Sequence, residues 1–238
     1  MRLTVLGCNG PYPAPGGATS GYLAEAGGAC FAMDFGSGCL SALTALMPPA
    51  ELDAVVLTHW HYDHCSDLLP LIYRLAAESV RLPLYAPEDE RQPVSRICAE
   101  AGVFEMRPYA PGDTLTVGGA VIRTAEARHP VRAAMLRVEA EGRAMVYTGD
   151  TNTCEALPEF ARGAELFLAD GPMTDAVWNE GRPHLSGRIA ARYAKEAGVH
   201  TFVLTHLIPS IDASTLLREA REERPDTLLA APRMTWSC

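Results

Sequence analysis

The sequence THWHYDHCSD at residues 58–67 places three histidines and an aspartate within six residues. These side chains belong to His59, His61, Asp63 and His64. Neutral imidazole and ionised carboxylate are the usual nitrogen and oxygen ligands of zinc, and they also bind manganese or iron. The alternative is a polar surface loop whose histidines gather by chance. Because so many potential ligands in one short run are costly unless something binds them, we predict a metal site here.

The residues on either side of this motif predict where it lies in the fold. Residues 52–58, LDAVVLT, form an apolar, β-branched run that is typical of a buried strand. Residues 65–78, CSDLLPLIYRLAAE, have helical spacing. The motif therefore lies on a strand-to-helix loop. There His59 and His61 can point one way while Asp63 and His64 face a second position.

Further candidate ligands follow apolar runs elsewhere in the chain. IRTAEARHP ends a predicted strand at His129, AMVYTGD ends another at Asp150, and TFVLTH ends a third at His206. A strand end is rigid enough to aim a side chain at a metal. One strand-end histidine alone would more often be structural or solvated, but three such residues together with the dense motif favour a metal site.

With these residues in place, the chain resembles the metallo-β-lactamase fold superfamily, whose pattern is HxHxDH followed by His, Asp and His. The resemblance extends from the opening strand to His206. It implies an α/β fold of four layers, an αββα sandwich with the metals at one edge of its two sheets.

The resemblance also implies two divalent metal ions, with zinc as the default and manganese or iron as alternatives. It assigns His59, His61 and His129 to one ion, Asp63, His64 and His206 to the other, and Asp150 together with a water or hydroxide to the bridge. Asp63 could also orient that hydroxide.

Single residues disfavour some branches of the superfamily. His61 stands where the oxygen-reducing diiron branch has glutamate, and Asp150 stands where common zinc β-lactamases have cysteine. Redox chemistry and antibiotic hydrolysis are therefore disfavoured. Cys65 and Cys154 flank the predicted ligands, but the ligand set is complete without them.

A proton donor for the leaving group is expected at His184, in RPHLSGRIAARYAKEAG, just before a helix that Ser186 could cap. This resembles the His-Leu/Met-Ser/Thr motif of the ribonuclease Z-like branch, where the histidine is the general acid. Asp170 stands where a carboxylate, more often glutamate, orients that histidine in the branch. Alternatively, His184 is a helix N-terminal residue that only meets anions.

Other residues near the motif have less specific expectations. The opening loop at residues 8–22 is similar to the Gly-rich first turn that borders the active site in the same branch, so Ser20 or local backbone amides could contact substrate. Asp34 is expected to be structural. Trp60 and Tyr62 either line the entrance or pack.

Alternating strand and helix patterns predict two packed sheets with helices outside. Strands are expected at residues 2–7, 21–26, 30–35, 52–58, 82–87, 114–117, 120–127, 134–140, 144–148, 164–170, 200–206 and 227–232. Helices are expected at residues 39–47, 65–78, 88–101, 154–162, 186–197 and 214–222. With no linker or low-complexity segment, residues 1–238 are expected to form one domain.

The composition of the chain limits which binding partners and which cellular compartment we expect. The chain is 48% hydrophobic and 21% charged, which is typical of a globular protein, and its net charge of −9 disfavours nucleic-acid binding. Seven cysteines without a regular framework favour a reducing cytoplasm. No signal peptide or membrane span is expected.

The substrate class depends on one short segment. Ribonuclease Z carries a tRNA-gripping arm between the third histidine motif and the bridging aspartate, but here only 20 residues separate His129 from Asp150. Armless relatives include phosphodiesterases of small cyclic phosphates, so a small phosphodiester is the leading substrate. The alternatives are tRNA 3′ processing, hydrolysis of a thioester, lactone or other carboxylic ester, and a non-catalytic metabolite-binding or regulatory protein. The branch also implies a homodimer.

Overall fold

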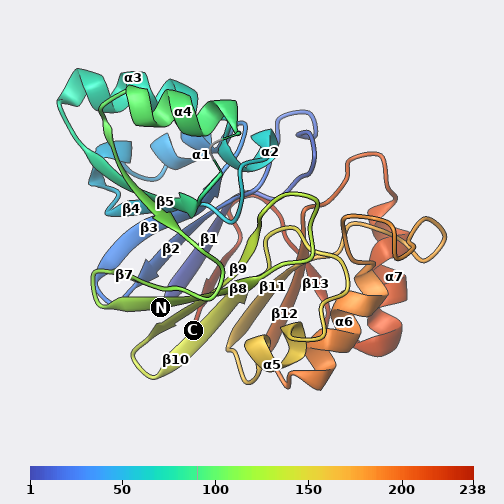
Figure 1. Ribbon diagram of the computed structural model, residues 1–238. Coiled ribbons are helices and arrows are strands. Elements are labelled where there is room, and N and C mark those ends of the chain that lie inside the picture. Colours follow the sequence, from blue (N-terminus) through green and yellow to red (C-terminus); the bar gives the residue numbers. More distant parts are fainter. Residues whose placement is uncertain (90) are drawn as a thin grey trace.

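The computed structural model describes residues 1–89 and 91–238. Its strands form two sheets of seven strands each (Figure 1). The first sheet has the order β14-β1-β2-β3-β4-β5-β6, and the second has the order β13-β12-β11-β10-β9-β8-β7. Each sheet is therefore built mainly from one half of the chain, with the last strand, β14, returning to the first sheet.

The first sheet changes from antiparallel to parallel along its width. Strands β14, β1, β2 and β3 pair antiparallel, whereas β3, β4, β5 and β6 pair parallel. Its strands are β1 (Arg2–Gly7), β2 (Gly21–Ala26), β3 (Ala29–Phe35), β4 (Ala54–Val56), β5 (Leu82–Pro87), β6 (Phe104–Tyr109) and β14 (Thr235–Ser237).

The second sheet has the same mixed character. Strands β7 to β10 pair antiparallel, and β10 to β13 pair parallel. Its strands are β7 (Thr114–Val117), β8 (Ala120–Glu126), β9 (Ala134–Ala140), β10 (Arg143–Tyr147), β11 (Leu166–Asp170), β12 (Thr201–Thr205) and β13 (Leu228–Leu229).

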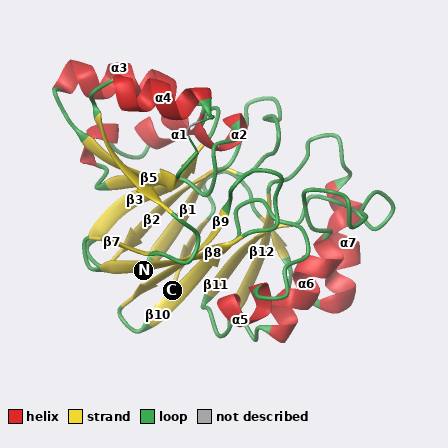
Figure 2. Ribbon diagram, in the orientation of Figure 1, coloured by secondary structure: helices red, strands yellow, loops and turns green. Residues whose placement is uncertain are grey.

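The helices cover the outer faces of the two sheets, as Figure 2 shows. Helices α1 to α4 lie over the first sheet and α5 to α7 over the second (Figure 1). The helices are α1 (Cys39–Thr44), a 3-10 turn at Pro49–Glu51, α2 (Tyr62–Cys65), α3 (Leu68–Glu78), α4 (Pro93–Glu100), α5 (Leu157–Ala161), α6 (Gly187–Glu196) and α7 (Ala213–Glu223).

Strand periodicity places side chains in successive layers of the core. In β3, Phe31 and Met33 join the cluster between the sheets, whereas Ala32 joins the cluster under the first helical layer. A third cluster fills the space between the second sheet and its helices. Successive residues of a strand point to opposite faces, so a strand covered on both sides is apolar throughout. The predicted α/β fold of four αββα layers is confirmed.

Several element boundaries differ from the predictions, and two strands were not predicted. The missed strands are β6 and β14, which lie at the two edges of the first sheet. In β6 only Phe104 and Tyr109 are buried, so its apolar signal is weak. Helix α4 begins at Pro93 instead of residue 88, because proline fits the first turn of a helix but not its interior.

Other predicted elements are shorter than expected. Helix α1 ends at Thr44 and not at residue 47, and α5 spans five residues where nine were predicted. The expected last strand is reduced to Leu228–Leu229. Among the described residues, none of the helices combines the length and the apolar character that crossing a bilayer requires.

Candidate metal centre

The candidate ligands meet at one edge of the two sheets because each follows the end of a strand. The first motif follows β4 and enters α2, His129 follows β8, Asp150 follows β10, and His206 follows β12. All seven predicted ligands therefore lie in one cluster, which divides into two groups that share Asp150.

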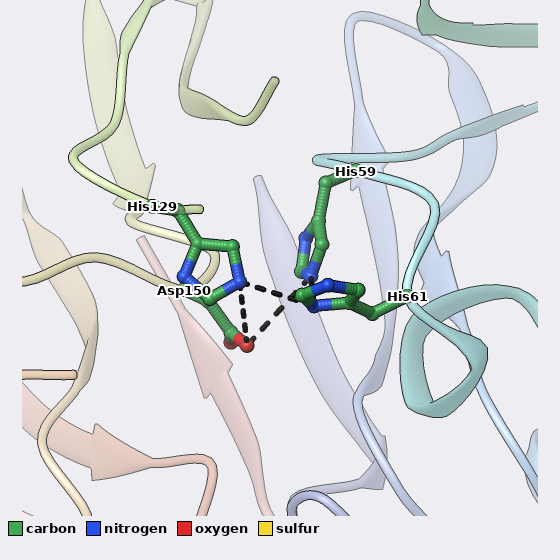
Figure 3. Close-up of side chains that lie close together, drawn as sticks. All are labelled: His59, His61, His129 and Asp150. Atoms are coloured by element: carbon green, nitrogen blue, oxygen red, sulfur yellow. Dashed lines mark hydrogen bonds and ion pairs between the residues drawn. The ribbon is translucent and has the colours of Figure 1, made fainter. Parts of the chain in front are cut away.

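The first group consists of three imidazoles and one carboxylate, and Figure 3 shows them converging. The Nδ1 atom of His61 lies 3.0 Å from the Nε2 atoms of both His59 and His129. The Oδ2 atom of Asp150 lies 3.7 Å from His59 Nε2 and 3.9 Å from His129 Nε2. Three nitrogen ligands and one oxygen around a common point fit a divalent cation such as zinc.

The second group lies on the other side of the same carboxylate. The Oδ1 atom of Asp150 is 3.1 Å from His64 Nε2 and 3.4 Å from His206 Nε2. Asp63 Oδ2 completes this group at 3.1 Å from His206 Nε2. Asp150 therefore directs one oxygen toward each group, which is the arrangement that a bridging ligand requires.

Unpartnered polar atoms support the fit of a cation to this cluster. Among the described residues, His64 Nε2 and Asp150 Oδ1 are buried, and although they lie 3.1 Å apart, neither makes a hydrogen bond of good geometry. Burying such groups without a partner is costly, so each is expected to have one. A metal ion between them would satisfy both atoms.

The protonation states of the first group also suit metal binding. Burial and then the nearby His64 lower the pKa of His59 well below its ordinary value. Burial likewise lowers the pKa of His61 and His129. Burial opposes ionisation of Asp150, but His206 and His64 outweigh it and lower its pKa. Neutral imidazoles and an ionised carboxylate are the forms that bind metal.

Hydrogen bonds behind the cluster orient the histidine rings. Fully buried Asp34 accepts from His64 Nδ1 at 2.7 Å and from the Tyr147 hydroxyl at 2.8 Å. Thr58 donates its backbone amide to the same carboxylate at 2.7 Å. A proton held on Nδ1 leaves Nε2 of His64 free to face the metal position. Asp34, expected to be structural, thus orients a candidate ligand.

Backbone strain coincides with two of these residues. Asp34 has φ 56° and His206 has φ 57°, in the left-handed region that non-glycine residues seldom adopt. Each such residue costs on the order of 1–3 kcal/mol and persists where its surroundings enforce it. In this backbone conformation, the Asp34 carboxylate and the His206 imidazole are directed toward the cluster.

His184 lies beside the cluster and is paired with Asp170. Its Nδ1 atom is 3.0 Å from Asp170 Oδ2, and its ring stacks on His206 with centroids 4.7 Å apart. Burial would lower the pKa of His184, but the charge and hydrogen bond of Asp170 outweigh it and raise the pKa to about 9. Asp170 is itself buried, and it also accepts from the Thr151 amide at 2.9 Å.

Several other predicted residues lie away from the reacting positions. Trp60 is buried and donates its indole N–H to Pro87 O, so it packs, whereas Tyr62 is 61% exposed. Ser20 is fully buried, which disfavours contact of its hydroxyl with a substrate, and contact through the local backbone amides stays a prediction. Among the described residues, neither Cys65 nor Cys154 belongs to a candidate ligand group.

Sequence reasoning missed the residue of the opening loop that does touch the cluster. A Cβ atom on Gly10 would lie 2.0 Å from His206 Nε2, so only glycine fits there. The signal was present as a glycine three residues after the end of the first strand, in a loop rich in glycine and proline. The role of this glycine depends on its contact with His206, which is 196 residues further along the chain.

Residues 37–207 match the family model described as a beta-lactamase superfamily domain. The probable metallo-hydrolase YhfI of Bacillus subtilis is 32% identical, with 87% of each chain covered. The crystal structure of YhfI superposes with a TM-score of 0.92 at 30% identity, covering 99% of this chain and 98% of that one.

Two further proteins are similar to this chain. Ribonuclease Z of Mycobacterium bovis is 31% identical, with 89% of this chain and 87% of the relative covered. A diphosphatase from the PhnP family superposes with a TM-score of 0.75 at 17% identity, covering 99% of this chain and 97% of that chain, which supports the common fold alone.

Proposed function

The chain belongs to the β-lactamase superfamily, and from that membership together with its buried histidine–aspartate cluster we propose that it is a dinuclear metal-dependent hydrolase of small phosphodiesters. The observation that carries the proposal is the position of Asp150, which directs one oxygen toward three imidazoles and the other toward a second ligand group. This arrangement suits two ions that share one carboxylate.

The proposed ligands each have a defined position around the two ions. His59, His61 and His129 would hold one divalent ion, Asp63, His64 and His206 would hold the other, and Asp150 would bridge them. Two bound ions supply hydroxide at neutral pH and polarise the group under attack. Zinc suits these ligands best, and manganese or iron would also fit.

The chain itself supplies the proton for the leaving group in this proposal. With its Nδ1 proton donated to Asp170, His184 would keep Nε2 for the proton that passes to the leaving group. Against the effect of burial, Asp170 raises the pKa of His184, which favours the protonated imidazole that a general acid requires. Asp170 fixes the ring and stabilises its charge, and Asp63 is placed to orient the nucleophile.

A small phosphodiester is favoured over tRNA by the segment between His129 and Asp150. Strands β9 and β10 are joined by a two-residue turn at Glu141 and Gly142, both with positive φ, which leaves no room for a projecting arm. The net charge of −9 also opposes binding to a polyanion. The same fold also occurs in a diphosphatase, which supports a phosphoryl substrate in this proposal.

Processing of tRNA 3′ ends is the second candidate function. Ribonuclease Z at 31% identity favours it, because its similarity extends over 89% of this chain. The two functions are separated by comparing cleavage of a precursor tRNA with cleavage of bis(p-nitrophenyl) phosphate. We expect turnover of the small diester and no specific cleavage of the tRNA.

A substrate panel tests the proposal as a whole. Metal-loaded protein is assayed with bis(p-nitrophenyl) phosphate, with cyclic nucleotides and with thioesters and lactones. Turnover of phosphodiesters supports the proposal. Rapid turnover of thioesters or lactones without phosphodiester cleavage would replace it with an acyl hydrolase. A metal-loaded protein that is inert toward every substrate, yet binds a metabolite, would indicate a non-catalytic binding protein.

A further inference from the structure

Asn152 makes a set of contacts that the proposed mechanism does not use. It lies two residues after Asp150, and its side chain is buried. It faces the segment between β11 and α6, residues 171–186, which carries His184 and is called the His184 loop here.

The side-chain amide of Asn152 can satisfy its contacts in only one orientation. Its Oδ1 atom accepts from the Thr153 amide at 2.7 Å and from Trp178 Nε1 at 3.2 Å. Its Nδ2 atom faces the carbonyl oxygens of Asn179, Glu180 and Arg182 at 3.4, 3.2 and 2.5 Å. Amide N–H groups can only donate and carbonyls can only accept, so a flipped side chain would lose every one of these bonds.

The part of the His184 loop that precedes His184, residues 176–183, has few other attachments. The rest of the loop is held separately, by bonds of Asp175 to Glu219 and Arg188 and of His184 to Asp170. Among the hydrogen bonds of the described residues, those joining residues 176–183 to segments outside the loop come from three side chains. Besides Asn152, these are Arg128, which donates to Glu180 O at 3.3 Å, and His129, whose Nδ1 faces Pro183 O at 3.2 Å. All three side chains belong to the segments that carry candidate metal ligands.

The contacts of Asn152 flank the position of His184. The carbonyl of Arg182, two residues before it, accepts the shortest of the amide bonds. Trp178 Nε1, which donates to Asn152, also donates to the carbonyl of His184 itself at 3.1 Å. Moving the Asn152 side chain would therefore break contacts that hold the backbone just before His184.

We propose that Asn152 is a positioning residue that holds the His184 loop against the strand end of Asp150, so that the general acid stays aligned with the leaving group. The proposal rests on the proposed function of His184. A displacement of about 1 Å can cost on the order of 10²-fold in rate. That loss should be largest for poor leaving groups, since these depend most on proton donation.

The test uses Asn152→Ala and Asn152→Asp in the metal-loaded protein. Substrates are methyl aryl phosphodiesters whose phenol leaving groups grade from p-nitrophenol to phenol. We expect kcat to fall about 10–100-fold for the phenol ester and less than about threefold for the p-nitrophenol ester. Asn152→Asp should lose at least as much as Asn152→Ala, because its carboxylate would face three carbonyl oxygens. Asn179→Ala is the matched control, because among the hydrogen bonds of the described residues its side chain makes one, to the nearby Gly181 amide.

A second readout does not depend on activity. Hydrogen exchange of the amides in residues 174–184 should speed up in both Asn152 variants, while metal content stays at the wild-type value. His184→Ala should show the same leaving-group dependence, with faster exchange confined to the amides next to residue 184, because it removes the acid and its bond to Asp170 but keeps the bonds of Asn152.

The outcomes separate this proposal from the proposed function. If His184→Ala steepens the leaving-group dependence but the Asn152 variants do not, the positioning role is wrong and the mechanism stands. Faster exchange without a change in leaving-group dependence would make Asn152 a purely structural residue and would also overturn the proposal. Wild-type protein without phosphodiesterase activity would contradict the proposed function itself, and the positioning role would fall with it.

Discussion

Asp150 is the residue on which the proposed centre depends most. Replacing it with alanine removes the oxygen atoms that face both ligand groups. We predict that Asp150→Ala lowers metal content from two ions per chain to one or none, and lowers phosphodiester turnover on the order of 10²–10³-fold. Metal analysis after gel filtration and steady-state kinetics check this.

Asp226→Ala is the matched control for Asp150→Ala, since Asp226 is an exposed carboxylate that pairs with Arg224. It should keep two ions and full activity. An Asp150→Ala protein that still holds two ions would show that the carboxylate is not the bridge.

Gly10 gives a prediction that only the folded arrangement supplies. A methyl group there would lie 2.0 Å from His206 Nε2, so either the ring or the loop must move. We predict that Gly10→Ala lowers occupancy of the second ion selectively and leaves about one ion per chain. Metal titration by calorimetry measures this, and Tyr12→Ala, with an exposed side chain in the same loop, should retain both ions. Two equally tight sites in Gly10→Ala would contradict the inferred contact.

The residue-scale predictions from sequence succeeded where spacing carried the information. The motif at residues 58–67 placed four candidate ligands, and the strand-end positions of His129, Asp150 and His206 placed the rest. The roles of Asp34, Gly10 and Asn152 depend on partners that are distant in sequence, so no local pattern could reveal them. The metal-binding and catalytic roles of the clustered residues remain predictions.

At the scale of elements, helix α7 has an N-cap that depends on pH. Asp212 accepts hydrogen bonds from the hydroxyls and amides of Thr215 and Ser214, and these lower its pKa to about 2. A carboxyl whose pKa is lowered in the folded state stabilises the fold above its ordinary pKa, near 4, and loses that contribution as the pH falls toward 2.

Asp212→Asn separates capping from charge, because asparagine is also a good N-cap residue. We predict that the difference in urea midpoint between wild type and Asp212→Asn is largest at pH 6 and shrinks as the pH falls to 3. Unfolding curves at both pH values measure the difference. A difference that is independent of pH would show that the carboxylate charge contributes nothing to the cap.

Element prediction from sequence found every strand that ends at the candidate centre, although β4 is shorter than predicted, and it missed two strands at the edges of the first sheet. Strands β4, β10 and β12 are buried and apolar, which makes them visible in the sequence. Strands β6 and β14 are partly exposed edge strands, and their pairing depends on neighbours far along the chain. The predicted helix ends differ from the observed ends where a proline or a short turn sets the boundary of the helix.

At the scale of the whole molecule, the proposed metals should stabilise the fold, because they join loops from both sheets. Ligand at 100 times its dissociation constant contributes about 2.7 kcal/mol to the native state. For a chain of this length we predict that removing metal lowers Tm by about 5–10 °C and that zinc restores it. Calcium, which prefers oxygen ligands, should not restore it. A Tm that is insensitive to chelation and to added zinc would argue against a metal centre.

At the scale of the whole molecule, some predictions from the sequence are confirmed and others stay predictions. The fold class and the family are confirmed, because the ligand pattern and the strand order belong together in this superfamily. A single domain, a homodimer and a cytoplasmic location stay predictions, since they depend on surfaces and surroundings that the ligand pattern does not encode.

The central claim is that two ions held by one shared carboxylate drive phosphodiester hydrolysis. Metal-free protein titrated with zinc, with turnover of bis(p-nitrophenyl) phosphate recorded at each addition, tests this claim most directly. The account predicts that activity rises to a plateau at two equivalents of zinc per chain. A plateau at one equivalent, or full zinc loading without phosphodiester turnover, would contradict it.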